Sequence, residues 1–227
     1  MTKTPRGNTV GSLTPTQHAV LVGSLLGDGT LRRQGNKLNA LFEVNHAFKF
    51  REYVDWKWQH FHQHVLTPPK PRAGNGKRVA YRFTTRSLPV FTNYHRFYDN
   101  GKKRVPPEIE LDPLSLAVWF IDDGSKSRGA WYLNTQQFSV AEQDHLRRVL
   151  KTTFGIESAL NRDKQYFRLR MSIKSTELMS DIISSYILPC FRHKLVHDPV
   201  TTESKDESFP ARGANTPTPA MPGQITA

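Results

Sequence analysis

The chain is poor in cysteine, with Cys190 as the single one among 227 residues. An internal disulfide and a zinc cluster built from thiolates are therefore excluded. No uninterrupted apolar run approaches the ~18 residues of a membrane-spanning helix. The polar stretch Met1–Thr16 also lacks the apolar core of a secretory signal. We therefore expect an intracellular protein, in the cytoplasm of a bacterium or in an organelle, neither secreted nor bound in a membrane.

Acidic residues are also scarce: 20 Asp and Glu stand against 32 Lys and Arg, a formal net charge of +12. A basic surplus spread along a chain suggests a polyanionic partner, most often nucleic acid. A merely basic soluble protein is the alternative. Hydrophobic content of 37% with 11% aromatics is in the globular range. The length allows one large domain or two small ones.

Two similar apolar segments, Leu21–Gly29 and Leu116–Gly124, lie about half a chain apart. Each is predicted to be a helix that ends in an acid followed by glycine, at Asp28 and at Asp123. A carboxylate at the end of an apolar helix is costly unless it meets a metal or a partner. If the motif occurred once, its acid would be interpreted as a helix cap or as one member of an ion pair. The repetition favours a role that the two acids share.

The rest of the pattern repeats in the same order, so each half is predicted as α-β-β-α-β-β-α. Thr14-Pro15 and Asp112-Pro113 each offer an N-cap followed by a first-turn proline. These signals predict the motif helices at Pro15–Gly27 and Leu114–Asp122. The other expected helices and strands are Gly29–Arg33, Leu38–Asn45, Lys49–Val65, Arg78–Thr85, Leu88–Tyr98, Lys126–Gly129, Trp131–Phe138, Ser139–Phe154, Ile156–Arg162, Gln165–Ser172 and Ser175–Leu188.

The composition divides the chain into four segments. A flexible lead is expected at 1–12, a first half at 13–111 and a second half at 112–202. The segment 203–227 is rich in Ser, Pro, Thr, Ala and Gly, and we expect it to be a disordered tail.

The two motifs and their flanks resemble the LAGLIDADG homing endonucleases over about residues 15–200. The form of Trp119–Gly124 is similar to the single-chain, double-motif (I-SceI-like) branch, as are Leu133–Gln136 and the Leu188–Leu195 ending. The resemblance implies an α+β fold with pseudo-two-fold symmetry and a monomer. Two saddle-shaped antiparallel sheets would lie in DNA major grooves, with the paired motif helices at the interface of the halves.

The resemblance also implies metal-dependent cleavage of both strands of a DNA duplex at a long asymmetric site, leaving 3′ overhangs. Mg²⁺ or Mn²⁺ suits two carboxylates, and with a single cysteine the chain has no paired-Cys arrangement that would favour zinc. Asp28 and Asp123 would be the catalytic acids and metal ligands. Gly27 and Asp122 directly precede them as further ligands, Asp122 through its main-chain carbonyl. No role follows for the side chain of Asp122.

Basic loops follow each half. Lys103 and Lys194 match family positions and are the candidates for stabilising the phosphate or poising the attacking water. Lys102, Arg104 and Arg192 lie within two residues of these lysines and are alternative candidates for the same role. A solvated loop that contacts the DNA backbone is the alternative for both lysines.

Polar residues on strand faces are the candidate DNA readers, because Arg pairs with guanine, and Asn and Gln with adenine. A solvated sheet face would have the same composition, and Glu43 and Gln136 could instead lie around the metal. The candidates are Arg32, Arg33, Glu43, Asn45, Arg72, Arg78, Arg82, Thr84, Lys126, Arg128, Asn134, Gln136, Arg162, Arg168 and Arg170.

Two other functions fit the same scaffold. An intron RNA-splicing maturase would bind intron RNA, alone or besides DNA. A DNA-binding regulator would carry degenerate motifs. The retention of both acids and both lysines favours the nuclease.

Overall fold

The computed structural model describes residues 12–74, 76, 78–127 and 129–195. The expected lead, apart from Ser12, and the expected tail lie outside these residues, as does Arg128. The first half contains α1 Pro15–Leu26, β1 Thr30–Arg33, β2 Ala40–Ala47, α2 Arg51–Phe61, β3 Lys70–Ala73, β4 Val79–Thr84, α3 Pro89–Thr92, β5 Tyr98–Asp99 and β6 Lys102–Lys103. The second half contains α4 Pro113–Asp123, β7 Gly124–Ser127, β8 Ala130–Leu133, α5 Val140–Phe154, β9 Ser158–Asp163, β10 Tyr166–Met171 and α6 Ile173–Ile183.

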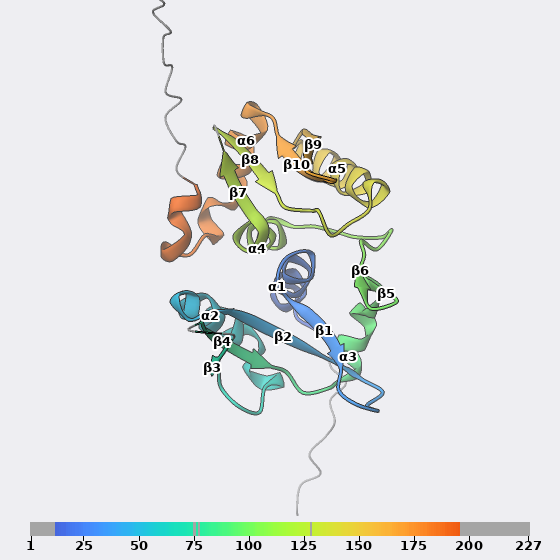
Figure 1. Cartoon of the computed structure of the whole chain (residues 1–227), viewed down its shortest axis with the longest axis vertical. Coiled ribbons are helices and arrows are strands. Elements are labelled where there is room, and N and C mark those ends of the chain that lie inside the picture. Colours follow the sequence, from blue (N-terminus) through green and yellow to red (C-terminus); the bar gives the residue numbers. More distant parts are fainter. Residues whose placement is uncertain (1–11, 75, 77, 128, 196–227) are drawn as a thin grey trace, which may run out of the picture.

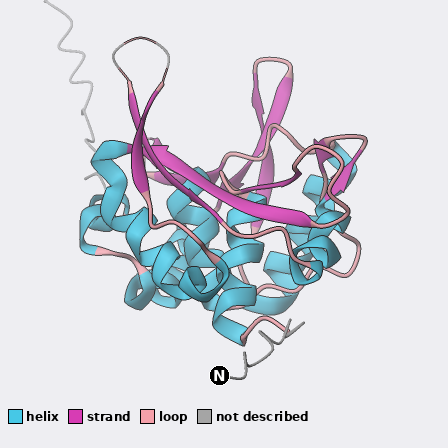
Figure 2. Cartoon of the chain, turned by 90° about the horizontal axis from the view of Figure 1, so that it is seen from below, coloured by secondary structure: helices cyan, strands magenta, loops and turns pink. Residues whose placement is uncertain are grey.

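Each half forms a four-stranded antiparallel sheet, with strand orders β1-β2-β4-β3 and β7-β8-β10-β9. The two orders are equivalent, which confirms the predicted α-β-β-α-β-β-α repeat and the α+β class. In Figure 1, α1 and α4 lie side by side at the centre, with one sheet on either side of them. Figure 2 shows the strands gathered on one side of the molecule and most helices on the other.

The motif helices begin where the sequence predicts. The Thr14 hydroxyl accepts from the main chain of Gln17, and the Asp112 carboxylate accepts from that of Ser115, each with a first-turn proline. A third capping box, between Ser139 and Glu142, opens α5. Such caps satisfy main-chain N–H groups that have no partner inside a helix.

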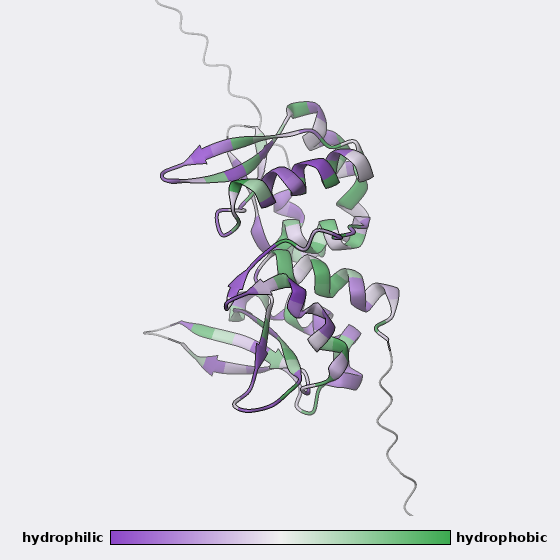
Figure 3. Cartoon of the chain, turned by 90° about the vertical axis from the view of Figure 1, so that its right-hand side faces the viewer, coloured by the Kyte–Doolittle hydropathy of each residue, from purple (hydrophilic) through white to green (hydrophobic). Residues whose placement is uncertain are grey.

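The apolar surfaces of α1 and α4 meet each other across the two halves. Leu21, Leu25, Trp119 and Phe120 are each at most 1% exposed and belong to one continuous core. Figure 3 shows this as hydrophobic colour concentrated in the central helices. A helix that is apolar on every side is stable only when buried. In the part of the chain that the structure describes, no helix is both long and apolar enough to span a membrane.

Several elements are shorter than predicted, and two of them differ most. The expected helix Leu88–Tyr98 consists of one α-turn, α3, followed by 3₁₀ residues Asn93–Phe97. The expected strand Trp131–Phe138 ends at Leu133, because the chain turns where the amide of Phe138 donates to the carbonyl of Thr135.

Candidate active site

Both motif acids lie where an apolar helix ends. Asp28 follows Gly27, the C-cap of α1, and Asp123 is the last residue of α4. The main-chain N–H of Asp28 donates to Oδ2 of Asp122 at 3.3 Å, so the two helix ends meet. A helix C-terminus carries partial negative charge. The two helix ends and the carboxylates of Asp28, Asp122 and Asp123 together form an electronegative centre, which is stabilised by nearby cations.

The crowding raises the pKa values of these acids. Burial, followed by the charges of Asp28 and Asp122, raises the pKa of Asp123 to about 7. Burial and the charge of Asp122 also raise the pKa of Asp28. The charge of Lys57 lowers the pKa of Asp28, and the charges of Lys103 and Lys194 lower the pKa of both acids, but both pKa values remain raised. Carboxylates that repel each other in this way provide hard oxygen donors that a divalent cation would stabilise.

The raised pKa of Asp123 predicts a pH dependence of stability in the metal-free protein. The folded chain keeps this carboxyl protonated up to about pH 7, whereas the unfolded chain releases the proton near 3.8. The folded state therefore binds more protons between these values, and its free energy of unfolding falls as pH rises through them.

We expect Asp123→Asn to be more stable than the parent at pH 7.5, with the difference shrinking toward pH 4.5. Urea unfolding of both proteins in EDTA measures it. A difference that does not change with pH would contradict the assignment.

Each motif helix ends against a lysine from the basic loop of its own half. Nζ of Lys103 donates to the carbonyl of Gly27. Nζ of Lys194 donates to the carbonyls of Ile121 at 2.6 Å and Gly124 at 2.9 Å. Burial lowers the pKa of both lysines. The structure thus brings the two predicted lysines to the acids.

The rival basic residues are placed differently. Lys102 and Arg192 are exposed to solvent. Arg104 lies near Glu142, where its charge adds to the hydrogen bonds from Ser139 and Val105 that lower the pKa of that carboxyl against the effect of burial.

The side chain of Asp122 has partners that the sequence did not reveal. Its carboxylate is fully buried, and Nζ of Lys57 lies 3.0 Å from Oδ2 and 3.1 Å from Oδ1. The hydroxyl of Tyr53 donates to Oδ1 at 2.8 Å. Both partners come from α2, in the other half of the molecule.

His46 lies between two of the acids. Its Nδ1 is 3.6 Å from Oδ2 of Asp28, and its Nε2 is 3.8 Å from Oδ1 of Asp122. Burial, and then the charge of Lys57, lowers its pKa to about 4. The imidazole is therefore neutral at pH 7, and Asp28, His46 and Asp122 form a group of possible metal ligands.

The strand register assigns most of the candidate DNA readers to the outward sheet faces. In the first half, Cα pairs align Arg32 with Leu41, Glu43 with Thr84, and Asn45 with Arg82. Residues directly opposite each other share a face, and alternation extends this face along each strand. The candidates on the two outward faces are Arg32, Glu43, Asn45, Arg72, Arg82, Thr84, Arg168 and Arg170. Arg78, just before β4, continues the alternation.

For three candidates the predicted outward orientation is wrong. Arg33 aligns with core residue Ala40, and Lys126 aligns with buried Trp131. Arg162 aligns with Phe167, on the face opposite to Arg168. Successive residues of a strand point to opposite faces, so Arg32 and Arg33, which are neighbours on β1, cannot both lie on the outward face.

Several outward candidates contact each other. Arg32 forms an ion pair with Glu43 at 2.8 Å, and Arg82 lies 3.8 Å from the same carboxylate. In the second half, Arg168 lies over the ring of Tyr132. The polar residues after β8 also have partners. Asn134 accepts from Arg168 at 3.4 Å, and Gln136 donates to Asp163 at 2.8 Å.

Tyr53, His46 and Lys57 are the site residues that sequence reasoning missed. A signal for Lys57 was present, because Val54 and Phe61 lie three residues before and four residues after it in the predicted helix. This spacing places the lysine on the buried face, where a charge needs a partner.

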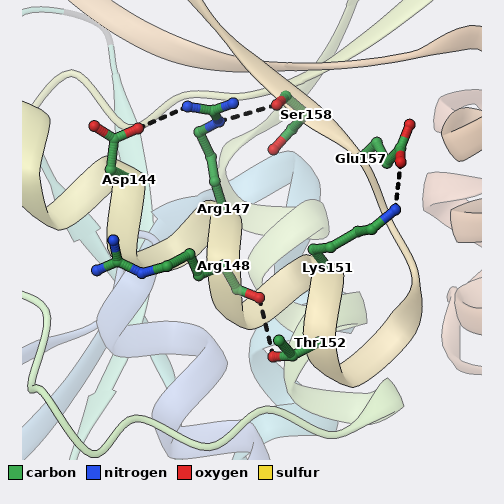
Figure 4. A pocket seen from close by; sticks show the side chains of 7 residues that line it. All are labelled: Asp144, Arg147, Arg148, Lys151, Thr152, Glu157 and Ser158. Carbon is green, nitrogen blue, oxygen red and sulfur yellow. Dashed lines mark hydrogen bonds and ion pairs between the residues drawn. The ribbon is translucent and has the colours of Figure 1, made fainter.

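A surface hollow beside α5 is a separate feature (Figure 4). Arg147 contacts Asp144 at 2.7 Å, and Lys151 forms an ion pair with Glu157. Its charges are thus largely balanced, and its lining includes no residue of the motif helices.

Comparisons with known proteins agree with this geometry. Residues 18–179 match the model of the LAGLIDADG DNA endonuclease family. The probable intron-encoded endonuclease 1 of Wickerhamomyces canadensis is 27% identical over 201 residues, which are 82% of this chain and 86% of that protein. The cytochrome b mRNA maturase bI2 of Debaryomyces hansenii is 28% identical over 188 residues, 78% of this chain and 72% of that protein.

A solved structure shares the fold closely. The homing endonuclease I-WcaI bound to its DNA recognition sequence superposes with a TM-score of 0.76 at 25% identity, covering 83% of this chain and 89% of that one. The family match spans most of the chain, including Asp28 and Asp123. The chain therefore belongs to the LAGLIDADG DNA endonuclease family, whose members hydrolyse phosphodiester bonds.

Proposed function

We propose that the chain is a homing endonuclease that acts as a monomer and cuts both strands of a long, asymmetric DNA site, leaving 3′ overhangs. The observation that carries the proposal is the meeting of the two motif-helix ends, where Asp28 and Asp123 lie with Lys103 and Lys194. One acid and one lysine come from each half. We assign the chain to the single-chain, double-motif branch, with halves at 13–111 and 112–202, and to intron homing.

The donor set fits Mg²⁺ or Mn²⁺. The carboxylates of Asp28 and Asp123 would hold the cation, because burial and the neighbouring carboxylates raise the pKa of both groups and a divalent cation would offset this cost of ionisation. The carbonyls of Gly27 and Asp122 are candidate further ligands. When bound, the cation would neutralise the carboxylates, polarise the phosphodiester and lower the pKa of the attacking water.

The chain's own residues supply the rest of the chemistry. The ammonium groups of Lys103 and Lys194 are held at the helix ends by carbonyl oxygens. Positive charge fixed before the reaction stabilises negative charge that develops on the phosphate. The burial that lowers the pKa of each lysine also strengthens its interaction with that charge.

The outward sheet faces are proposed to contact the DNA major groove. Arg side chains line these faces in both halves, joined by Asn45 and Thr84 in the first half. A net charge of +12 favours a polyanion. I-WcaI was solved on its DNA recognition sequence, which supports this use of the fold. The two faces differ in sequence, so the recognised site should be asymmetric.

Selection of cleaved molecules from a randomised DNA library, with Mg²⁺ or Mn²⁺, tests the proposal. We expect one long non-palindromic site whose product ends carry 3′ overhangs, and no products in EDTA. A palindromic site would contradict a monomer with two unlike halves. No cleavage with either metal would favour the DNA-binding regulator.

A maturase role is the second candidate, because a relative covering most of the chain is named a cytochrome b mRNA maturase. Its partner would be intron RNA. Comparing the splicing of the host intron with and without the protein distinguishes this role from DNA cleavage alone.

A further inference from the structure

A buried ion pair joins the two halves beside the acids. Lys57 on α2 and Asp122 on α4 both have 0% side-chain exposure, and Nζ lies 3.0 Å from Oδ2. Removing two charges from water is costly and is offset only when the geometry is good and further hydrogen bonds are made. The Tyr53 hydroxyl makes such a bond to Oδ1 at 2.8 Å. The charge of Asp122 is thus balanced by protein groups before any cation binds.

Asp122 also supports the main chain that carries Asp28. Its Oδ2 accepts the main-chain N–H of Asp28 at 3.3 Å. A Cβ added to Gly27 would lie 2.4 Å from Cβ of Asp122, so the two chains are in close contact there. The buried pair therefore fixes the main chain at the end of α1, and with it the position from which the Asp28 side chain extends.

The charge of Asp122 acts on both motif acids, but its side chain hydrogen-bonds the main chain of Asp28, whereas Asp123 is linked to it only as the next residue of the chain. The position before Asp28 is occupied by Gly27, which has no side chain to form an equivalent pair. At that end of α1, the second half contributes the uncharged Gln137, whose Nε2 donates to the carbonyl of Leu26 at 3.1 Å. The two halves of the site are thus supported differently, although the acids and lysines repeat.

We propose that Lys57 and Asp122 are positioning residues that hold the Asp28 carboxylate for one of the two strand cuts. The inference rests on the proposed function. It adds that each motif acid serves mainly the cleavage of one strand of the duplex. Residues that orient a metal ligand typically change affinity or activity ~10–100-fold when removed. Loss of this pair should therefore slow one nick while the other proceeds.

The test uses Lys57→Met/Asp122→Leu, which replaces the ion pair by apolar side chains of similar size so that no charge is left buried. Nicking rates are measured on each strand of a labelled target duplex with Mg²⁺. We expect one rate to fall ~10–100-fold and the other to change less than about threefold. Amide hydrogen exchange of Asp28, measured without metal, should become at least about tenfold faster, because its acceptor is removed.

Ser175→Ala is the matched control, because it removes a hydrogen bond of 2.8 Å between the main-chain N–H of Glu157 and the buried hydroxyl of Ser175, and neither residue belongs to a motif helix or contacts the acids. It should lower stability and leave the ratio of the two nicking rates unchanged. Equal loss on both strands, or no loss on either, in a folded double variant would overturn the inference while leaving the nuclease assignment intact. If the parent protein cuts no DNA, the proposed function fails, and unchanged Asp28 amide exchange would independently overturn the positioning role.

Discussion

Asp28→Asn and Asp123→Asn are each expected to lower DNA cleavage at least ~10³-fold, because each removes a charged ligand from a centre that stabilises the reacting phosphate. DNA affinity, measured in Ca²⁺ by fluorescence anisotropy, should change less than about threefold or become tighter. Asparagine keeps the size of the side chain and removes negative charge that repels the DNA backbone.

Asp144→Asn is the control for this pair. Asp144 lies on α5 in an exposed ion pair with Arg147, and such pairs contribute little to stability. Its cleavage rate should match that of the parent. Retained cleavage by either Asp28→Asn or Asp123→Asn would show that the motif acids are not the catalytic pair.

Gly23→Val is expected to cost ~3 kcal/mol or more of the free energy of unfolding, at the upper end of overpacking penalties. A Cβ at Gly23 would lie 2.4 Å from the main-chain carbonyl oxygen of Ser115 and 2.8 Å from Cβ of Val118. The carbonyl of Ser115 belongs to the first turn of α4 and cannot move aside without that helix, so α1 and α4 would have to separate. Urea unfolding and the thermal midpoint measure the loss.

Gly35→Asn is the matched control. Gly35 has a φ of +54°, and nothing lies within 4 Å of an added Cβ. Asparagine tolerates this conformation better than most residues. Its unfolding free energy should stay within ~0.5 kcal/mol of the parent, as for most surface substitutions. A Gly23→Val protein as stable as this control would contradict the close approach of the two helices.

Much of the fold followed from local patterns. The caps at Thr14, Asp112 and Ser139 located the starts of three helices, because capping depends on residues only three positions apart. The doubled motif indicated two similar halves, and alternation located the long strands. Short elements were less predictable. Thr135 lies in a turn where the sequence predicts strand, because its hydroxyl contacts Gln143 rather than a neighbouring strand.

The candidate site divided in the same way. Lys103 and Lys194 were predicted and lie at the helix ends. The partners of Asp122 were not predicted, because Tyr53 and Lys57 are more than sixty residues away in sequence. Arg33 was assigned to the wrong face, because a strand's orientation depends on the register of its pairing with another strand.

The sequence by itself determined which residues can carry the chemistry: two acids, each after an apolar helix, and two basic loops at equivalent positions. Local hydrogen bonding and periodicity are sufficient to encode these elements. The resemblance already implied that the two motif helices pair, which the structure confirms for α1 and α4. Only the tertiary structure decided that Asp122 is neutralised by Lys57, and that its side chain supports the main chain of Asp28. Those features depend on contacts between segments that are distant in sequence. Asp122 and Lys57 become buried, and therefore pair with each other, only when the two halves pack together.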